Sequence, residues 1–229
     1  MEFIQTSVYF GVVLTLAAYL FGVWLKKKWN VPIVQPLLIA IVVILAILLL
    51  GNIDYKVYAK GADYISYLLT PTTVALAVPL YEQLALLKKN MAAILAGILA
   101  GALTSAVCVL GIAILFSFDH SQYVTMLPKS VTAAIGMGIS EELGGIVTIT
   151  VAVIVITGVV GNILAETVCK VFRITEPVAK GIGIGSAAHA LGTVKAMEMG
   201  PVEGAMSSLS IAVSGLSTVV IAPIFAMFY

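Results

Sequence analysis

The sequence has few charged residues, and this scarcity excludes an ordinary soluble fold. Only 10% of its 229 residues are charged and 61% are hydrophobic, whereas soluble domains carry about 25% charged residues. A soluble chain of this composition would leave large apolar patches in water. Its apolar runs are continuous rather than alternating, which disfavours a membrane β-barrel. We therefore predict an all-α, polytopic transmembrane protein in a lipid bilayer.

Residues that commonly bind metals or attack substrates are also scarce. Both cysteines, Cys108 and Cys169, lie inside apolar runs, where small core side chains are expected rather than a disulfide or metal site. No CxxC, HExxH or P-loop sequence is present, so we predict no metal and no cofactor. A net charge of +1 offers no general attraction for nucleic acid. No nucleophile–base pair is recognisable, which disfavours an intramembrane enzyme.

The sequence does contain one pattern three times. Small, hydroxyl-bearing and helix-breaking residues occur with carboxylates, and a long apolar run follows. The three polar stretches are residues 70–82, 128–145 and 186–203, and the apolar runs are residues 91–116, 146–169 and 205–229. Each run is long enough to cross a bilayer. Irregular polar backbone is tolerated at membrane depth only where it is buried in protein or lines a wet cavity, so the pattern predicts a path for a solute.

Apolar residues 8–25 and 32–50 predict two spans ahead of these units, and residues 54–63 read as a mixed-charge loop. Most lysines and the arginine fall on the cytoplasmic side if residues 129–142 enter the membrane and return without crossing. We therefore predict about seven to eight membrane segments with discontinuous or re-entrant helices.

In this topology residues 64–116 and 181–229 run in opposite directions, as in the inverted repeats of secondary transporters. The chain is expected to form one integral membrane domain over residues 1–229. Residues 1–63 would supply two scaffold spans, and residues 64–229 the three units of broken helix and span.

The first polar stretch places Thr70, Thr72 and Thr73 around Pro71. Their hydroxyls could bond backbone carbonyls that the proline leaves free. Alternatively, the hydroxyls and the N–H groups of a broken helix could bind a carboxylate. Pro71 and Pro79 are candidate helix breaks and gating points.

The second polar stretch contributes a cation. Lys129 follows a proline and precedes a small-residue helix. It is either an interfacial lysine that extends to the membrane surface or a counter-ion for an anionic solute. In the second interpretation Ser130 and Thr132 donate hydrogen bonds to the solute. Gly144 and Gly145 are candidate breaks at the end of this stretch.

The third polar stretch contains His189 among alanine, glycine and serine residues. Thr193, four residues later, shares its helical face. His189 is either a hydrogen-bonded core histidine or a substrate ligand and proton relay. Ser186 is a further candidate ligand, and Gly192 is a candidate helix break.

Five other charged side chains are expected either to form a structural or interfacial ion pair or to be solvated. Lys195 and Glu198 have the spacing of an ion pair on one helix. Glu82, Glu166 and Glu203 lie at predicted segment ends, where we expect solvated carboxylates.

These stretches resemble the LrgB/CidB family of bacterial membrane proteins. The matching strings are LTPTTVALAVPLYEQ, LPKSVT, SEELGG, AAHALGT and EGAMSSL, which begin at residues 69, 127, 140, 187 and 203. The resemblance covers essentially the whole chain. Two departures are Ala133-Ala134, where the family usually has Thr-Pro, and Ala188, where it usually has Ser. Both departures remove helix-breaking or hydroxyl character from the predicted site.

The resemblance implies two alternative functions. Members are described as holin- or antiholin-like regulators of murein hydrolase export and cell lysis, acting with a smaller LrgA/CidA-like partner in the bacterial cytoplasmic membrane. Plastid glycolate/glycerate transporters are similar to the two components fused, and bacterial pairs are linked to pyruvate movement, which implies transport. Interrupted segments with hydroxyls, a lysine and a histidine favour transport over a self-associating pore.

We therefore predict a transporter of small 2-hydroxy or 2-keto monocarboxylates such as pyruvate or glycolate, and not an enzyme. The threonines of the first stretch and the Lys129–Ser130 turn would bind the carboxylate. His189 and Thr193 would bind the hydroxyl or keto oxygen or carry a proton. The small-residue faces also allow a homodimer.

Overall fold

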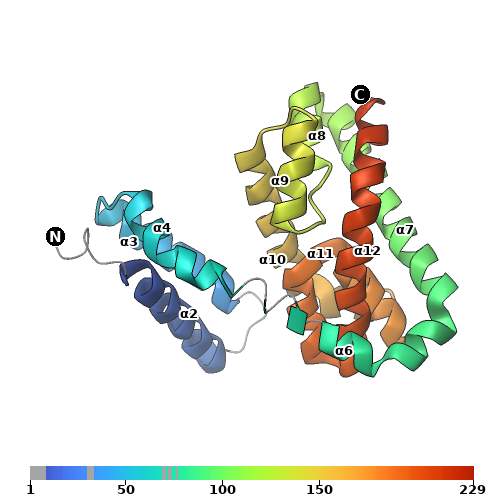
Figure 1. Ribbon diagram of the computed structural model, residues 1–229, viewed down its shortest axis with the longest axis horizontal. Coiled ribbons are helices and arrows are strands. Elements are labelled where there is room, and N and C mark those ends of the chain that lie inside the picture. The colour runs from blue at the N-terminus through green and yellow to red at the C-terminus, as the bar shows by residue number, and fades with distance from the viewer. Residues whose placement is uncertain (1–8, 30–33, 69–70, 72–73, 76) are drawn as a thin grey trace. The chain divides into compact units, whose positions relative to one another are not determined.

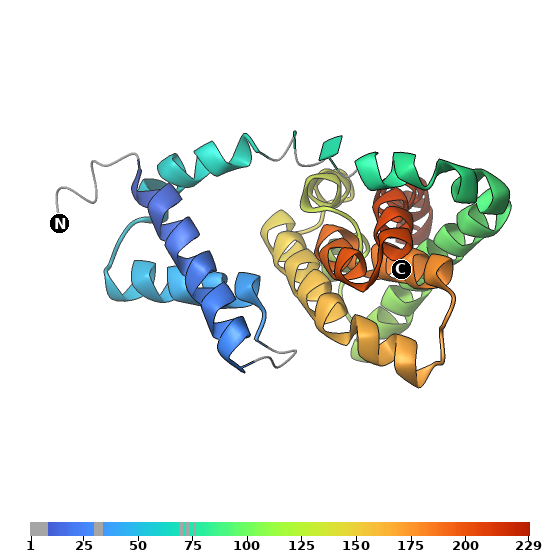
Figure 2. The same cartoon turned by 90° about the horizontal axis from the view of Figure 1, so that it is seen from below.

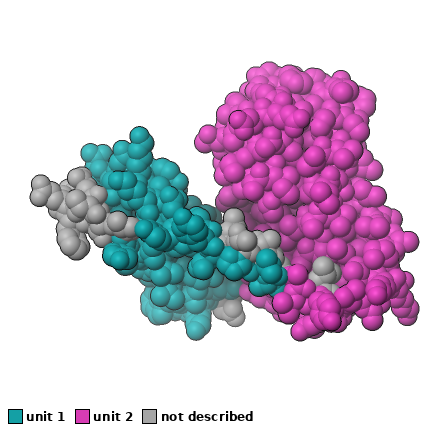
Figure 3. Space-filling model, in the orientation of Figure 1, with its two compact units in different colours: residues 1–75 teal, residues 76–229 magenta. Residues whose placement is uncertain are grey.

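The computed structural model describes residues 9–29, 34–68, 71, 74–75 and 77–229. The chain divides into two compact units, residues 1–75 and 76–229 (Figure 3). All regular secondary structure in these described residues is helical, which confirms the all-α prediction.

The first unit contains α2 (Phe10–Trp29), α3 (Pro36–Leu50) and α4 (Tyr55–Ser66). The prediction of a loop over residues 54–63 is wrong, because Asp54 caps α4 by accepting a hydrogen bond from the Lys56 N–H at 2.8 Å. The charged residues at 56, 60 and 63 are three or four positions apart and therefore share one helical face. On another side of α4, the Tyr58 hydroxyl lies 2.8 Å from Thr15 Oγ1 of α2.

The second unit is larger and contains the candidate site. Its helices are α6 (Ala77–Glu82), α7 (Leu84–Phe116), α8 (His120–Met126), α9 (Ala133–Glu142), α10 (Val147–Val171), α11 (Pro177–Met199) and α12 (Pro201–Ala226).

Four described helices are long and apolar enough to cross a membrane: α2, α7, α10 and α12. Helix α3 is also apolar but has 15 residues, fewer than the roughly 20 that a straight span requires. These helices support a polytopic membrane protein. The count of seven to eight segments and the inverted relation between residues 64–116 and 181–229 stay predictions.

Helices α8 and α9 form a helical hairpin. The Ser121 hydroxyl at the start of α8 donates to the Gly144 carbonyl just beyond α9, at 3.2 Å. Gly144 has a left-handed φ of 78°, and the Gly145 N–H bonds to the Ser140 carbonyl at 2.7 Å. This is the Schellman pattern that ends helices at glycine, so α9 ends at this pair of glycines, while a gating role for Gly144 and Gly145 stays a prediction. The outer ends of the hairpin therefore lie together, and the turn over residues 127–132 lies at its inner end.

Helix α11 also turns back on itself. Its helical geometry breaks at His189, which has φ 42° and ψ −137°. Ile184 and Ala196 belong to one core cluster, although a straight helix would separate them by about 18 Å. A Cβ at Gly192 would lie 3.0 Å from the Ile184 carbonyl oxygen, so the two arms approach closely there. The turn is thus at His189, three residues before the predicted break, and Gly192 serves the packing of the arms.

Among the long helices of the second unit, α7 and α12 run in one direction and α10 runs in the other (Figure 1). The Tyr229 hydroxyl after α12 donates to the Ala113 carbonyl near the end of α7 at 3.2 Å, so α7 and α12 point the same way. Figure 2, which views α12 nearly end-on, shows α7 (green) beside it. Helix α10 begins where the Ile146 N–H bonds to Thr125 of α8 at 2.8 Å, and it runs back toward the ends of α11.

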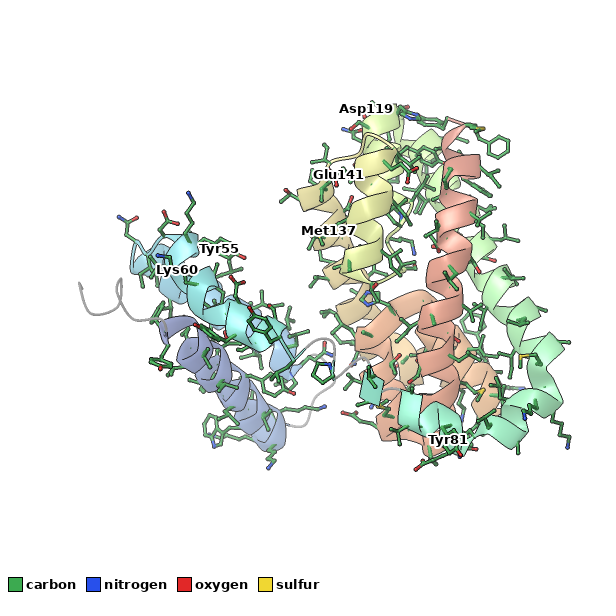
Figure 4. All side chains as sticks on the ribbon, in the orientation of Figure 1. Tyr55, Lys60, Tyr81, Asp119, Met137 and Glu141 are labelled. Atoms are coloured by element: carbon green, nitrogen blue, oxygen red, sulfur yellow. The ribbon has the colours of Figure 1, made fainter. Side chains whose placement is uncertain are left out.

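The unit therefore contains a long helix followed by a hairpin twice, in opposite orientations. The α8–α9 hairpin follows α7 from the end that Asp119 marks in Figure 4. The α11 hairpin follows α10 from the end that Tyr81 marks. In Figure 1, α8 and α9 accordingly occupy the upper half of this unit and α11 the lower half.

Two core clusters hold the helices of the second unit together. One core cluster joins α7, α8, α9 and α12 through residues such as Ala106, Ala113 and Ala222. A second cluster, mostly of larger side chains, joins α7 to the N-terminal parts of α11 and α12 through Ile94, Ile98 and other residues. The alanines of the first cluster allow the close approach that is typical of helices associated within a membrane.

Candidate functional site

A cavity of about 370 Å³ lies where α7, the α8–α9 turn and the first arm of α11 meet. We call it the Lys129 cavity. Its polar lining consists of Thr104, Ser105, Cys108, Lys129, Ser130 and Ser186. The second and third polar stretches of the sequence therefore both contribute to this cavity, through Lys129, Ser130 and Ser186, and their role as substrate ligands stays a prediction.

Lys129 and Ser130 form the polar centre of this cavity. The Lys129 ammonium donates to Ser130 Oγ at 2.9 Å, and Ser130 Oγ lies 3.3 Å from Ser105 Oγ. Ser130 is only 7% exposed. Among the described residues, no carboxylate forms an ion pair with Lys129. An uncompensated ammonium beside hydroxyl donors is suited to a small anion.

Ser186 forms the wall that α11 contributes to the cavity. It is 5% exposed, and its hydroxyl has no hydrogen-bond partner in the part of the chain that the structure describes. A Cβ at Gly101 of α7 would lie 3.2 Å from the Ser186 Cβ, so glycine allows α7 to approach this wall. An unsatisfied buried hydroxyl is costly, and a polar ligand in the cavity would satisfy it.

Sequence reasoning missed the contribution of α7. Thr104 and Ser105 lie inside the apolar run of residues 91–116 and face the same cavity as Lys129. The available signal was the pair of adjacent hydroxyls within an otherwise apolar span, where polar groups require partners.

His189 and Thr193 are not among the residues that line the Lys129 cavity. His189 is 5% exposed, and its Nε2–H donates to the Ile154 carbonyl of α10 at 3.0 Å. Thr193 Oγ1 donates to the His189 carbonyl at 3.0 Å and lies 2.7 Å from Ser207 Oγ of α12. This arrangement matches the core-histidine interpretation, because these bonds hold the turn of α11 against α10 and α12.

Other predicted site residues also lie outside the cavity lining. Thr132 immediately precedes α9 and makes no side-chain capping bond. Pro79 lies within α6. The predicted carboxylate-binding threonines, Thr70, Thr72 and Thr73, lie outside the described residues, whereas Pro71 is described and exposed.

A separate crevice of about 750 Å³ lies at the ends of α10, α11 and α12. Its charges balance, because its lining includes Glu166, Lys170, Arg173, Lys180, Glu198 and Glu203. Lys195, behind this crevice, bonds to Glu166 at 2.6 Å and to Glu198 at 3.2 Å. The predicted Lys195–Glu198 pair is therefore confirmed.

The expectation of a solvated carboxylate at residue 203 is wrong. Glu203 is only 7% exposed because the first turn of α12 packs against α11. Its Oε1 lies 3.9 Å from the Lys180 ammonium. Since carboxylates accompany the cations, this crevice is a weaker anion site than the Lys129 cavity.

Comparison with known proteins identifies the family. The LrgB-like family model matches residues 15–228. The antiholin-like protein LrgB of Bacillus mycoides (strain KBAB4) is 39% identical over 221 residues, which cover 96% of each chain. Proteins of the same name from Bacillus cereus (strain B4264) and Bacillus anthracis (strain CDC 684 / NRRL 3495) have the same identity and coverage. No solved structure matches the chain significantly. Since the match extends over nearly its full length, the chain belongs to the LrgB-like family of membrane proteins.

Proposed function

We propose that this protein transports small organic monoanions across the bacterial cytoplasmic membrane through the Lys129 cavity. The observation that supports this proposal most directly is the position of Lys129, which lines a cavity and whose ammonium pairs with no carboxylate of the described residues. A substrate carboxylate would accept hydrogen bonds from Lys129 and from the hydroxyls of Ser130 and Ser186. One ammonium balances one negative charge, which favours monocarboxylates such as pyruvate, glycolate or lactate.

The two oppositely oriented helix–hairpin pairs support this proposal. Secondary transporters commonly bind solutes between inverted repeats, at discontinuous helices near the membrane midplane. Here the turn of the α8–α9 hairpin and the first arm of α11 approach one cavity from opposite ends of the unit. We propose that both hairpins are re-entrant, and that residues 84–142 and 147–199 are the inverted pair. This pairing differs from the one expected from the sequence.

The relatives support a second function more directly than they support transport. They are named antiholin-like proteins, which favours a regulator of murein hydrolase export and cell lysis. Such a regulator requires no solute site of its own. In either function, we propose that the protein works with a smaller LrgA/CidA-like membrane partner.

Uptake into proteoliposomes separates the two functions. Purified protein, alone and with its LrgA/CidA-like partner, is reconstituted and supplied with labelled pyruvate, glycolate or lactate. Transport predicts saturable uptake that excess unlabelled acid inhibits. If neither preparation shows saturable uptake of any of these acids, transport is refuted and the regulatory function is favoured. Empty liposomes, and liposomes with the partner alone, are the controls.

A further inference from the structure

A second, much smaller cavity lies behind Ser130. It has a volume of about 10 Å³ and lies between α7, the α8–α9 turn and α12. Its hydroxyl lining consists of Ser105, Ser130, Ser214 and Thr218. Ser105 and Ser130 therefore line both this cavity and the Lys129 cavity. The volume corresponds to about one water molecule.

Ser214 is the residue that points to an occupant. It is 2% exposed, and its hydroxyl has no hydrogen-bond partner among the described residues. Its neighbours on the same helix are satisfied, since Ser210 Oγ donates to the Met206 carbonyl at 2.8 Å. Thr218 Oγ1 donates to the Ser214 backbone carbonyl at 2.7 Å, so Thr218 is also satisfied and does not pair with the Ser214 hydroxyl. Buried polar groups without protein partners usually bind ordered water.

The chemistry of the lining favours water over a metal cation. The lining side chains include no carboxylate, and the Lys129 ammonium bonds to Ser130, one of the lining residues, at 2.9 Å. A cation in the small cavity would therefore face a nearby positive charge without compensation. An organic anion is too large for this volume. Water fits, because it both donates and accepts hydrogen bonds.

We propose that one water molecule bound to Ser214 links α12 to the candidate site and orients the Ser130 hydroxyl toward the anion. Ser130 Oγ already accepts from Lys129, and its single hydrogen must point at the anion to bind it. Ser105 must then donate its own hydrogen to Ser130. A water molecule that accepts a hydrogen bond from Ser214 and donates one to Ser105 completes a chain of hydrogen bonds. Every donor in this chain points toward the anion. Ser214 is thereby a positioning residue for anion binding, an inference that rests on the proposed function.

Thermal unfolding of the detergent-solubilised protein without added anion tests the water site. Ser214→Ala and Ser214→Cys remove the hydroxyl, and Ser217→Ala is the matched control because Ser217 Oγ donates to the Val213 carbonyl of its own helix. A bound water predicts that both Ser214 variants lower the Tm by about 2–4 °C relative to the control. A dry cavity predicts an unchanged or raised Tm, because removing an unsatisfied hydroxyl is neutral or stabilising, and this result would overturn the proposal.

Calorimetric titration with pyruvate tests the link to the candidate site. We expect Ser214→Ala to weaken binding by about 2- to 10-fold, the effect of one neutral hydrogen bond. Ser105→Ala combined with Ser214→Ala should be no weaker than Ser105→Ala alone, because both residues act through one chain. Additive losses, or unchanged affinity in Ser214→Ala, would overturn the orienting role. If unaltered protein binds none of pyruvate, glycolate and lactate, the proposed function fails, and the orienting role fails with it. The unfolding temperatures still decide whether water is bound.

Discussion

Replacing Lys129 by glutamine should abolish most anion binding while leaving the fold intact. In the structure, the ammonium donates to Ser130 Oγ at 2.9 Å and forms no ion pair with any described carboxylate. Glutamine keeps a hydrogen-bonding group of similar length and removes the charge. Because a partly buried charge without a counter-ion is unfavourable, we expect the Tm of Lys129→Gln to be unchanged or higher.

The loss of affinity follows from the charge. An ammonium and a carboxylate 4 Å apart attract by about 4 kcal/mol at an effective dielectric constant of 20. Lys129 is only partly buried, so the interaction is weaker, and hydrogen bonds to charged groups contribute about 1.5–3 kcal/mol. At about 1.4 kcal/mol for each tenfold change, this free energy corresponds to a loss of anion affinity of roughly 10- to 150-fold. We expect the KM for uptake to rise by about the same factor.

The assay is the initial rate of labelled pyruvate uptake into proteoliposomes over a range of concentrations. Lys195→Gln is the matched control, because it removes an ammonium that bonds to Glu166 at 2.6 Å and Glu198 at 3.2 Å. That variant should lower the Tm and leave the KM unchanged, the reverse of Lys129→Gln. An unchanged KM in Lys129→Gln would refute the assignment of Lys129 as the anion ligand.

Three further predictions follow from the structure. His189→Gly should unfold at a higher temperature than His189→Ala, by about 1 kcal/mol in stability, because residue 189 has a left-handed φ of 42°; equal Tm values would contradict a strained turn. Gly101→Ala should reduce the rate of uptake, because the added Cβ would lie 3.2 Å from the Ser186 Cβ in the wall of the Lys129 cavity. Gly111→Ala should retain the uptake rate, since no atom lies within 4 Å of its added Cβ. Equal rates in the two variants would contradict the placement of Ser186 in the cavity wall. Glu166→Gln should lower the Tm at low salt by a shift equivalent to about 1 kcal/mol or less, and the difference should shrink at high salt; a salt-independent difference would contradict a partly exposed ion pair.

The sequence was sufficient to locate three residues of the candidate site. The sequence marks Lys129, Ser130 and Ser186 because charged, hydroxyl-bearing and helix-breaking residues beside long apolar runs cost free energy in a membrane. Their types also indicated the chemistry, since hydroxyls around one ammonium suit a small anion. The structure adds that the three line one cavity.

The contributions of α7 and α12 could not be predicted in the same way. Ser105 and Ser214 line cavities, but Ser208 and Ser217 donate to carbonyls four residues earlier on their own helix. A hydroxyl within an apolar run has the same sequence signal in both cases. Only the packing of the helices distinguishes a ligand from a side chain that is satisfied locally.

The residue at which α11 turns was also not predicted correctly. A break was expected at Gly192, since glycine is the usual helix breaker. The chain instead turns at His189, and a bond from its ring to the Ile154 carbonyl holds the turn. That contact joins residues 35 positions apart, so no local pattern could reveal it.

Protection of Cys108 against alkylation tests most directly whether the Lys129 cavity binds the organic anion. Cys108 is exposed and lines the cavity, whereas the other cysteine, Cys169, is buried outside it. In a Cys169→Ser background, Cys108 is the single reactive thiol. Saturating pyruvate should slow its reaction with a maleimide several-fold, and Lys129→Gln should remove this protection. An alkylation rate that pyruvate leaves unchanged would contradict binding in this cavity.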